Sequence, residues 1–291
     1  MISFNYVAQV PSLNTTTNLK ELTFASYKQL VKLVLNDNNE QIIDTFNQII
    51  DQLSTIESKN LTYLDKLIIL LTIRSVCVYP ALELSLEAKN KQIYNLKFEI
   101  SDIIDKLNNS LLFKKYNNVV KTYDKFKITY GIPEQLYFNN ENDLVISCIK
   151  TIQTETNGDI TKYKDSIIDS LPAVVYFDAK QHIKEFESEI GELTLLTVQT
   201  SVGDSESSYE ITPSVFNNSP LELLKLSFKR DLISLYELEY FLSAKLNLSS
   251  QLIQNSTYAE LMIYIGFYND ERKQTEVAEK QAFKNPLSPN G

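Results

Sequence analysis

The sequence predicts an α+β fold that is predominantly α-helical, with a helical N-terminal part, antiparallel hairpins in the middle and a helical C-terminal part. Apolar residues recur at three- and four-residue spacing in the first and last quarters of the chain, which is typical of amphipathic helices. Between these regions the period falls to two, as in antiparallel strands with one solvent-facing side. The 291 residues are 43% hydrophobic and 11% aromatic, which is enough to bury a core.

The first 78 residues predict one strand and three helices. Alternation over residues 2–7 indicates a short strand, and the polar run at 14–18 indicates a loop. Two helices follow, the second with Asn39 as its expected N-cap. The third begins at Thr62, with Asp65 at capping-box spacing. Because this helix is apolar on nearly every side, we expect it at the centre of the core. The stripes of the first two helices are Tyr27, Leu30, Val31, Val34 and Leu35, then Ile42, Ile43, Phe46, Ile49, Ile50 and Leu53.

The middle of the chain predicts two hairpins separated by helices and extended segments. Leu82, Leu84 and Leu86 alternate with polar residues, and the pattern returns before Ile100, which indicates the first hairpin. A second hairpin is expected over 193–212. The segments between them are expected to be helical at 103–107, 134–155, 161–171 and 172–190, extended at 119–123 and 126–130, and a turn at 157–159.

The last third contains three Ser or Thr residues that each precede a Glu by three positions, the spacing of a capping box. These residues, Ser219, Ser234 and Thr257, predict helices near 220–230, 235–247 and 258–281. We expect an N-terminal region over 1–155, a second region over 156–283 and an exposed Pro-containing tail over 284–291.

The negative net charge of the chain argues against nucleic acid as a partner. The 28 basic and 37 acidic residues give a net charge of −9, whereas nucleic-acid binders cluster Lys and Arg. One segment with interleaved aromatic residues has the composition of a single-strand binding stripe. The alternative, a solvated strand face whose aromatic residues point inward, is preferred. The segment contains Lys114, Lys115, Lys121, Lys125 and Lys127 together with Tyr116, Tyr123 and Phe126.

Few side chains in this sequence are suited to catalysis or metal binding, so we expect no catalytic residue, no cofactor and no metal site. His182 is the only histidine, and its polar neighbours indicate a surface position. Cys77 and Cys148 are expected to be reduced, buried thiols. An enzyme that uses carboxylates alone, or a Mg²⁺ or Ca²⁺ site built from them, remains an alternative. The apolar run 67–78 contains Arg74 and is too short for a bilayer, so no membrane association is expected.

Aromatic residues gather on the last two predicted helices. They form either the core between two packed helices or a partner-binding face, since Tyr and Phe favour the centres of interfaces. The candidate partner-binding residues are Tyr236, Tyr240, Phe241, Tyr258, Tyr264, Phe267 and Tyr268.

The order of features over residues 19–78 resembles that of the baseplate hub assembly proteins of T4-like contractile-tailed bacteriophages. The resemblance rests on the helix start at 22–30, on the Ile-rich second helix, and on a Leu-rich third helix that ends in Arg74-Ser75-Val76. Here the aromatic–threonine order of the family is reversed, as Thr23-Phe24. The resemblance continues after Pro80 and covers about two thirds of the chain. Some relatives have a cysteine-containing ribbon where this chain has the cysteine-free segment 193–211.

The resemblance implies a non-enzymatic protein that helps to build the central hub under the tail tube. Its implied partners are phage hub, tube or other tail proteins, and its implied locations are the host bacterial cytoplasm during assembly and the virion baseplate. The main hypothesis is a chaperone or adaptor role, and the alternative is a permanent structural component of the virion. The oligomeric state is left open.

Overall fold

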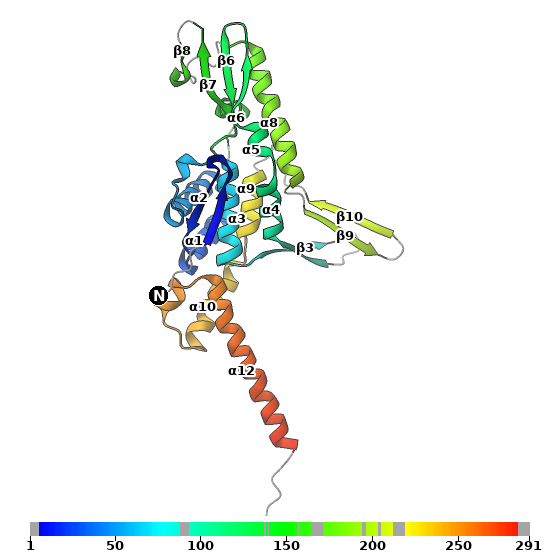
Figure 1. Ribbon diagram of the computed structural model, residues 1–291. Coiled ribbons are helices and arrows are strands. Elements are labelled where there is room, and N and C mark those ends of the chain that lie inside the picture. The colour runs from blue at the N-terminus through cyan, green and yellow to red at the C-terminus, as the bar shows by residue number, and fades with distance from the viewer. Residues whose placement is uncertain are drawn as a thin grey trace, which may run out of the picture.

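The computed structural model describes residues 6–87, 93–136, 138, 140–155, 158–163, 171–193, 196–202, 205–211 and 219–284. Within these residues the helix Tyr63–Cys77, α3, lies at the centre of the helical body, and the β-strands form one four-stranded sheet and three separate hairpins (Figure 1). The mostly helical α+β fold is therefore confirmed.

Helices α1 (Phe24–Asn36) and α2 (Asn39–Leu53) begin at side-chain caps. The Thr23 hydroxyl accepts a hydrogen bond from the backbone N–H of Ser26, and α1 ends at Asp37, which has a left-handed backbone conformation. The N-cap of α2 is Asn38 rather than the predicted Asn39, since the Asn38 side chain accepts from the N–H of Gln41.

The central helix α3 (Tyr63–Cys77) is buried along twelve of its fifteen residues. Thr62 and Asp65 form the predicted capping box at its start, and the second carboxylate oxygen of Asp65 accepts from the backbone N–H of Ser12 at 3.0 Å. Near its other end, the Arg74 guanidinium donates to the backbone oxygens of Ser227 and Ala81. The residue that interrupts the apolar run thus ties α3 to two other segments.

The N-terminal prediction of one strand and a polar loop was partly wrong. Strand β1 (Tyr6–Val10) pairs antiparallel with β2 (Thr15–Leu19) through a short 3-10 turn, so the expected loop is a second strand. The β-branched threonines of this segment suit a strand. Thr17 is buried, and its hydroxyl lies 2.8 Å from that of Ser54 and 2.9 Å from that of Thr55.

The two hairpins predicted in the middle of the chain are confirmed. Strands β3 (Ala81–Glu87) and β4 (Ile93–Glu99) form the first, and β9 (Leu196–Val202) and β10 (Ser205–Ile211) form the second. Both extend from the same side of the helical body (Figure 1). Helices α4 (Ile100–Asn109) and α5 (Leu112–Tyr116) follow the first hairpin.

The four-stranded sheet runs in the order β5-β6-β7-β8. It lies with α6 and α8 at one end of the molecule (Figure 1). The helix predicted over 134–155 exists only as α6, and its second half is strand β7, because the Ile and Thr residues there pair with β6. The bounds are β5 Val119–Thr122, β6 Phe126–Tyr130, α6 Glu141–Cys148, β7 Ile149–Thr154, β8 Gly158–Asp159 and α8 Ala173–Leu193.

Two of the predicted features around β8 lie partly outside the described residues. In the expected turn at 157–159, residue 157 is not among them, and Gly158 has a positive φ of 65°. Of the helix expected at 161–171, the structure describes a 3-10 turn at Thr161–Tyr163, and residues 164–170 fall outside.

The described residues 219–284 form four helices rather than the three predicted. They are α9 (Ser219–Phe228), α10 (Leu232–Ala244), the short α11 (Ser250–Asn255) and α12 (Tyr258–Lys284). The Thr257–Glu260 capping box is confirmed. The prediction for Ser234 was wrong, because Asp231 caps α10 and accepts from the N–H groups of Ile233 and Ser234. All of the expected tail except Lys284 lies outside the described residues.

The largest cluster of buried residues joins the two ends of the chain. Leu221, Leu224 and Phe228 of α9 belong to the same cluster as the residues of α1–α3, and the Phe46 and Phe228 rings lie 5.6 Å apart. A second cluster lies between the four-stranded sheet and α8. The predicted division of the chain near residue 155 stays a prediction.

Candidate partner-binding surface

Helix α10 covers the core with one side and leaves the other side apolar and exposed. Leu235 and Leu242 are fully buried. The exposed residues Ile233, Tyr236 and Tyr240 recur at spacings of three and four, so they lie along one face of the helix. Tyr240 is 72% exposed, although an aromatic side chain of this size is normally at least half-covered.

Helix α12 starts in the core and then leaves the body of the protein (Figure 1). Its first turn buries Tyr258 and Leu261. The next two turns remain apolar while they become exposed, and Phe267 is 68% exposed. We use the name α10–α12 surface for the exposed residues Ile233, Tyr236, Tyr240, Met262, Ile263, Tyr264 and Phe267.

Three contacts fix the helices that carry this surface. The Phe241 and Tyr268 rings pack edge to face at 5.4 Å, which joins α10 to α12. The Lys28 ammonium of α1 lies 5.1 Å from the centre of the Tyr236 ring and forms a 2.6 Å ion pair with Glu239, half-buried under α10. The exposed aromatic residues therefore sit on helices that are held against the body.

Of the seven aromatic residues predicted for a partner-binding face, the structure places six at or near the surface and one in the core. Tyr258 is 4% exposed; its ring lies 5.6 Å from that of Tyr27, and the Arg230 guanidinium stands 4.9 Å from its centre. The core interpretation therefore applies to Tyr258, and the partner-binding interpretation of the exposed residues stays a prediction.

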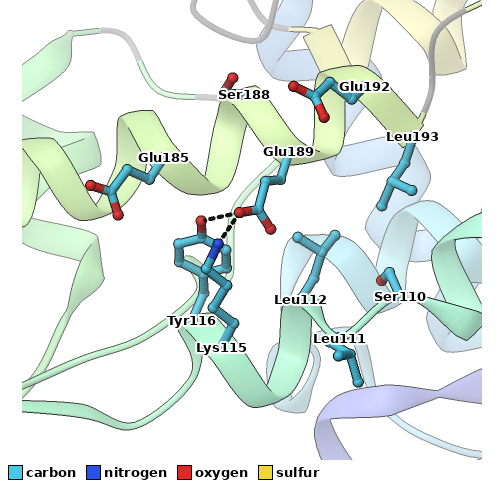
Figure 2. A pocket seen from close by; sticks show the side chains of 10 residues that line it. All are labelled: Ser110, Leu111, Leu112, Lys115, Tyr116, Glu185, Ser188, Glu189, Glu192 and Leu193. Atoms are coloured by element: carbon cyan, nitrogen blue, oxygen red, sulfur yellow. Dashed lines mark hydrogen bonds and ion pairs between the residues drawn. The ribbon is translucent and has the colours of Figure 1, made fainter.

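A cavity of about 610 Å³ lies between α5 and α8 (Figure 2). In Figure 2, Lys115 and Tyr116 of α5 reach Glu189 of α8, and the Tyr116 hydroxyl donates to the Glu189 carboxylate at 2.8 Å. The hydrogen bond from Lys115 lowers the pKa of Glu189. Glu185 and Glu192 also line the cavity, so its walls are acidic and its single lysine is paired.

The basic segment with interleaved aromatic residues turns its rings toward the protein. Tyr116 is buried, and the Tyr123 hydroxyl lies 2.7 Å from that of Tyr130 and donates to Asp178 at 2.5 Å. Lys121 forms an ion pair with the same carboxylate at 2.9 Å. The burial of Tyr116 and the hydroxyl contacts of Tyr123 agree with the preferred interpretation, in which the aromatic residues point inward.

Two buried ionisable residues of α8 were not foreseen. His182, predicted at the surface, is 9% exposed and lies between the rings of Tyr116 and Tyr130, at 5.5 and 5.7 Å, because α8 is covered on two sides. Burial lowers the pKa of His182 below its ordinary value of 6.5.

The second residue, Glu187, is 6% exposed, and its Oε2 atom makes no hydrogen bond within the described structure. Burial, with a smaller contribution from Glu141, raises the pKa of Glu187 from 4.5 to about 7. The sequence did carry one indication for both residues, since His182 and Glu187 each follow a buried residue of the α8 stripe by three or four positions.

The comparison with family models decides what kind of protein carries this surface. The family described as T4 bacteriophage base plate protein matches residues 1–216. The chain belongs to this family. Neither a curated protein nor a solved structure matches the chain.

Membership gives this T4-type baseplate protein a structural or assembly role in the phage baseplate. The match ends before α9, so the α10–α12 surface lies on the part of this baseplate protein that the family description does not reach. No helix in the described part of the chain combines the length and apolar character needed to cross a bilayer. Within those same residues, no group of three or more His, Cys, Asp or Glu is placed to hold a metal ion.

Proposed function

We propose that the protein is a non-enzymatic assembly chaperone or adaptor of the baseplate hub that binds hub, tube or other tail proteins through the α10–α12 surface. It acts in the host cytoplasm during tail assembly. The observation that carries the proposal is the concentration of exposed apolar residues on two helices. Of the fifteen large hydrophobic residues described as strongly exposed, seven lie between Ile233 and Phe267.

Leaving this apolar surface in water is unfavourable in free energy. Exposed apolar patches that are rimmed by polar residues mark interaction sites. Burial of apolar area contributes roughly 25 cal/mol per Å², and aromatic residues dominate such contacts. After Asn269 the helix becomes charged, and pairs such as Arg272–Glu276 at 3.0 Å occupy its solvated end. The apolar part of α12 therefore has a defined end.

Co-expression with the cognate hub and tube proteins tests the proposal. We expect the full chain to form a complex that survives purification, and truncation at about Asn269 to weaken it. Phe267→Ser should weaken binding by about tenfold or more, because truncation of an aromatic hot spot costs roughly 2 kcal/mol or more. Failure of the full chain to bind any hub, tube or tail protein would exclude this function.

A matched control is available on α8. Phe177 is 67% exposed, as Phe267 is 68% exposed, but it belongs to α8, whose residues Val175 and Ala179 pack in the cluster with the four-stranded sheet. Phe177→Ser should leave the complex intact. If both variants reduce binding equally, the effect is one of general surface hydrophobicity and the α10–α12 surface has no special role.

Permanent incorporation in the virion is the alternative role, and the family membership is compatible with both. Mass spectrometry of purified particles distinguishes them. A chaperone should be absent from mature particles, whereas a building block should be present in fixed stoichiometry.

A further inference from the structure

Among the described strands, none pairs with the outer edges of the hairpin of β9 and β10, and these two edges differ in charge. The seven residue pairs from Leu196↔Ile211 to Val202↔Ser205 join the two strands without a bulge, and no described strand pairs with either outer edge. Free edges are templates for further strand pairing unless charge, proline or a bulge blocks them. Strand β9 contains no charged residue and no proline, whereas β10 contains Glu206 and Glu210.

From the order of residues in β9, we propose that this edge pairs antiparallel with β9 of a second copy of the chain, around a two-fold axis at Gln199. The strand reads Leu-Thr-Val-Gln-Thr-Ser-Val, and it has the same chemical character in both directions. In this register Leu196 stands opposite Val202 of the second copy, and Thr197 stands opposite Ser201. Val198 meets Thr200, and Gln199 meets itself.

Every one of these pairs is favourable for an antiparallel ladder. Aliphatic or β-branched residues stand opposite each other at the positions that share one face, and hydroxyl residues at the positions that share the other. A glutamine opposite a glutamine can exchange amide hydrogen bonds, since the side chain carries both donor and acceptor atoms. Two-fold symmetry requires a self-complementary patch, which this strand supplies.

The other edge of the hairpin does not support the same contact. Antiparallel pairing of β10 with its own copy around Ser208 would place Glu206 opposite Glu210 of the second copy, twice per dimer. Like charges directly opposite each other destabilise a sheet. The contact through β9 would therefore give a closed four-stranded sheet whose outer edges carry the glutamates, so assembly stops at two copies.

Charge variants of the full chain test this pairing. Sedimentation velocity over a wide range of concentrations should show a reversible dimer of the wild-type protein. Gln199→Glu and Gln199→Lys each place like charges at the two-fold axis and should weaken self-association by about fivefold or more. An equimolar mixture of the two variants should restore the dimer, and native mass spectrometry should find it to be mostly mixed. This rescue separates a lost contact from a misfolded hairpin.

Ser208→Lys is the matched control, because Ser208 pairs with Gln199 inside the hairpin but belongs to the other strand. It should leave the dimer at wild-type strength. A wild-type protein that is monomeric at all concentrations would overturn the proposal. So would a dimer that both Gln199 variants leave unchanged, or one that Ser208→Lys weakens as much as they do.

Discussion

Glu187 makes the stability of this protein depend on pH in a direction that is unusual for a carboxyl group. Its pKa rises from 4.5 to about 7 on folding, because the group is buried on α8. The folded state therefore binds a proton more tightly than the unfolded state. Stability is highest below the unfolded pKa and is lost as the pH rises through about 7. Glu187→Gln removes this ionisation and retains the shape of the side chain.

The structure sets an upper limit on the effect. A difference of 2.5 pKa units, at 1.36 kcal/mol per unit, corresponds to about 3 kcal/mol between pH 4.5 and pH 8. The buried amide that replaces the carboxyl adds a cost that does not change with pH, since its hydrogen-bonding groups also need partners. The difference between variant and wild type should therefore move in favour of the variant by roughly 2–3 kcal/mol from pH 5 to pH 8.

Urea denaturation of both proteins at pH values of about 5, 6, 7 and 8, on both sides of the raised pKa, measures how their difference in stability changes with pH. Glu185→Gln is the control, because Glu185 lies two positions away on the exposed side of α8. A general effect of removing a negative charge would appear in both variants. Parallel pH profiles of wild type and Glu187→Gln would refute the reasoning, since they would mean that Glu187 titrates equally in the folded and unfolded states.

Three further predictions concern the core. His182→Gln should reduce the loss of stability on acidification from pH 7.5 to about 5.5, because the pKa of folded His182 lies below 6.5 and the unfolded state takes up the proton first. Thermal melts at the two pH values measure this loss, and an unchanged acid sensitivity of the variant would contradict the prediction. Asp65→Ala removes the acceptor for the backbone N–H of Ser12 and for the N–H and hydroxyl of Thr62. The free energy of unfolding measured in urea should fall by about 3 kcal/mol. A loss below about 1 kcal/mol would mean that water replaces the carboxylate. Arg74→Met should lower the melting temperature by about 5–10 °C, because the backbone oxygens of Ser227 and Ala81 lose the guanidinium that donates to them. An unchanged melting temperature would show that the methionine compensates fully.

Sequence reasoning located the helices well because their determinants are local. Thr62 and Asp65, or Thr257 and Glu260, lie within one turn of each other, so the capping spacing and the apolar period are both visible in the sequence. One error concerns a strand whose pairing partner lies elsewhere. Residues 149–154 fit a helical spacing, and only pairing with β6 makes them a strand. Non-local contacts of this kind are not encoded in a short window.

The candidate site was predictable only in outline. The sequence identified the aromatic residues of α10 and α12, but it did not separate buried Tyr258 from exposed Tyr240, since both lie in apolar helical segments. That difference depends on which side of each helix faces the core. His182 was misplaced for a related reason, because a helix covered on two sides buries positions that a single apolar stripe would leave exposed.

The hydrogen bonds between the two ends of the chain have a consequence for its synthesis. Lys28 pairs with Glu239, 211 positions later, and Arg74 donates to Ser227, 153 positions later. The first three helices therefore leave the ribosome long before the segment that covers them exists, and they must wait with apolar surface exposed. A ribosome that stops near residue 216 would release a polypeptide with all the residues of the family match but with the sides of α1 and α3 that face α9 uncovered. In an infected cell such fragments would be targets for host proteases and chaperones.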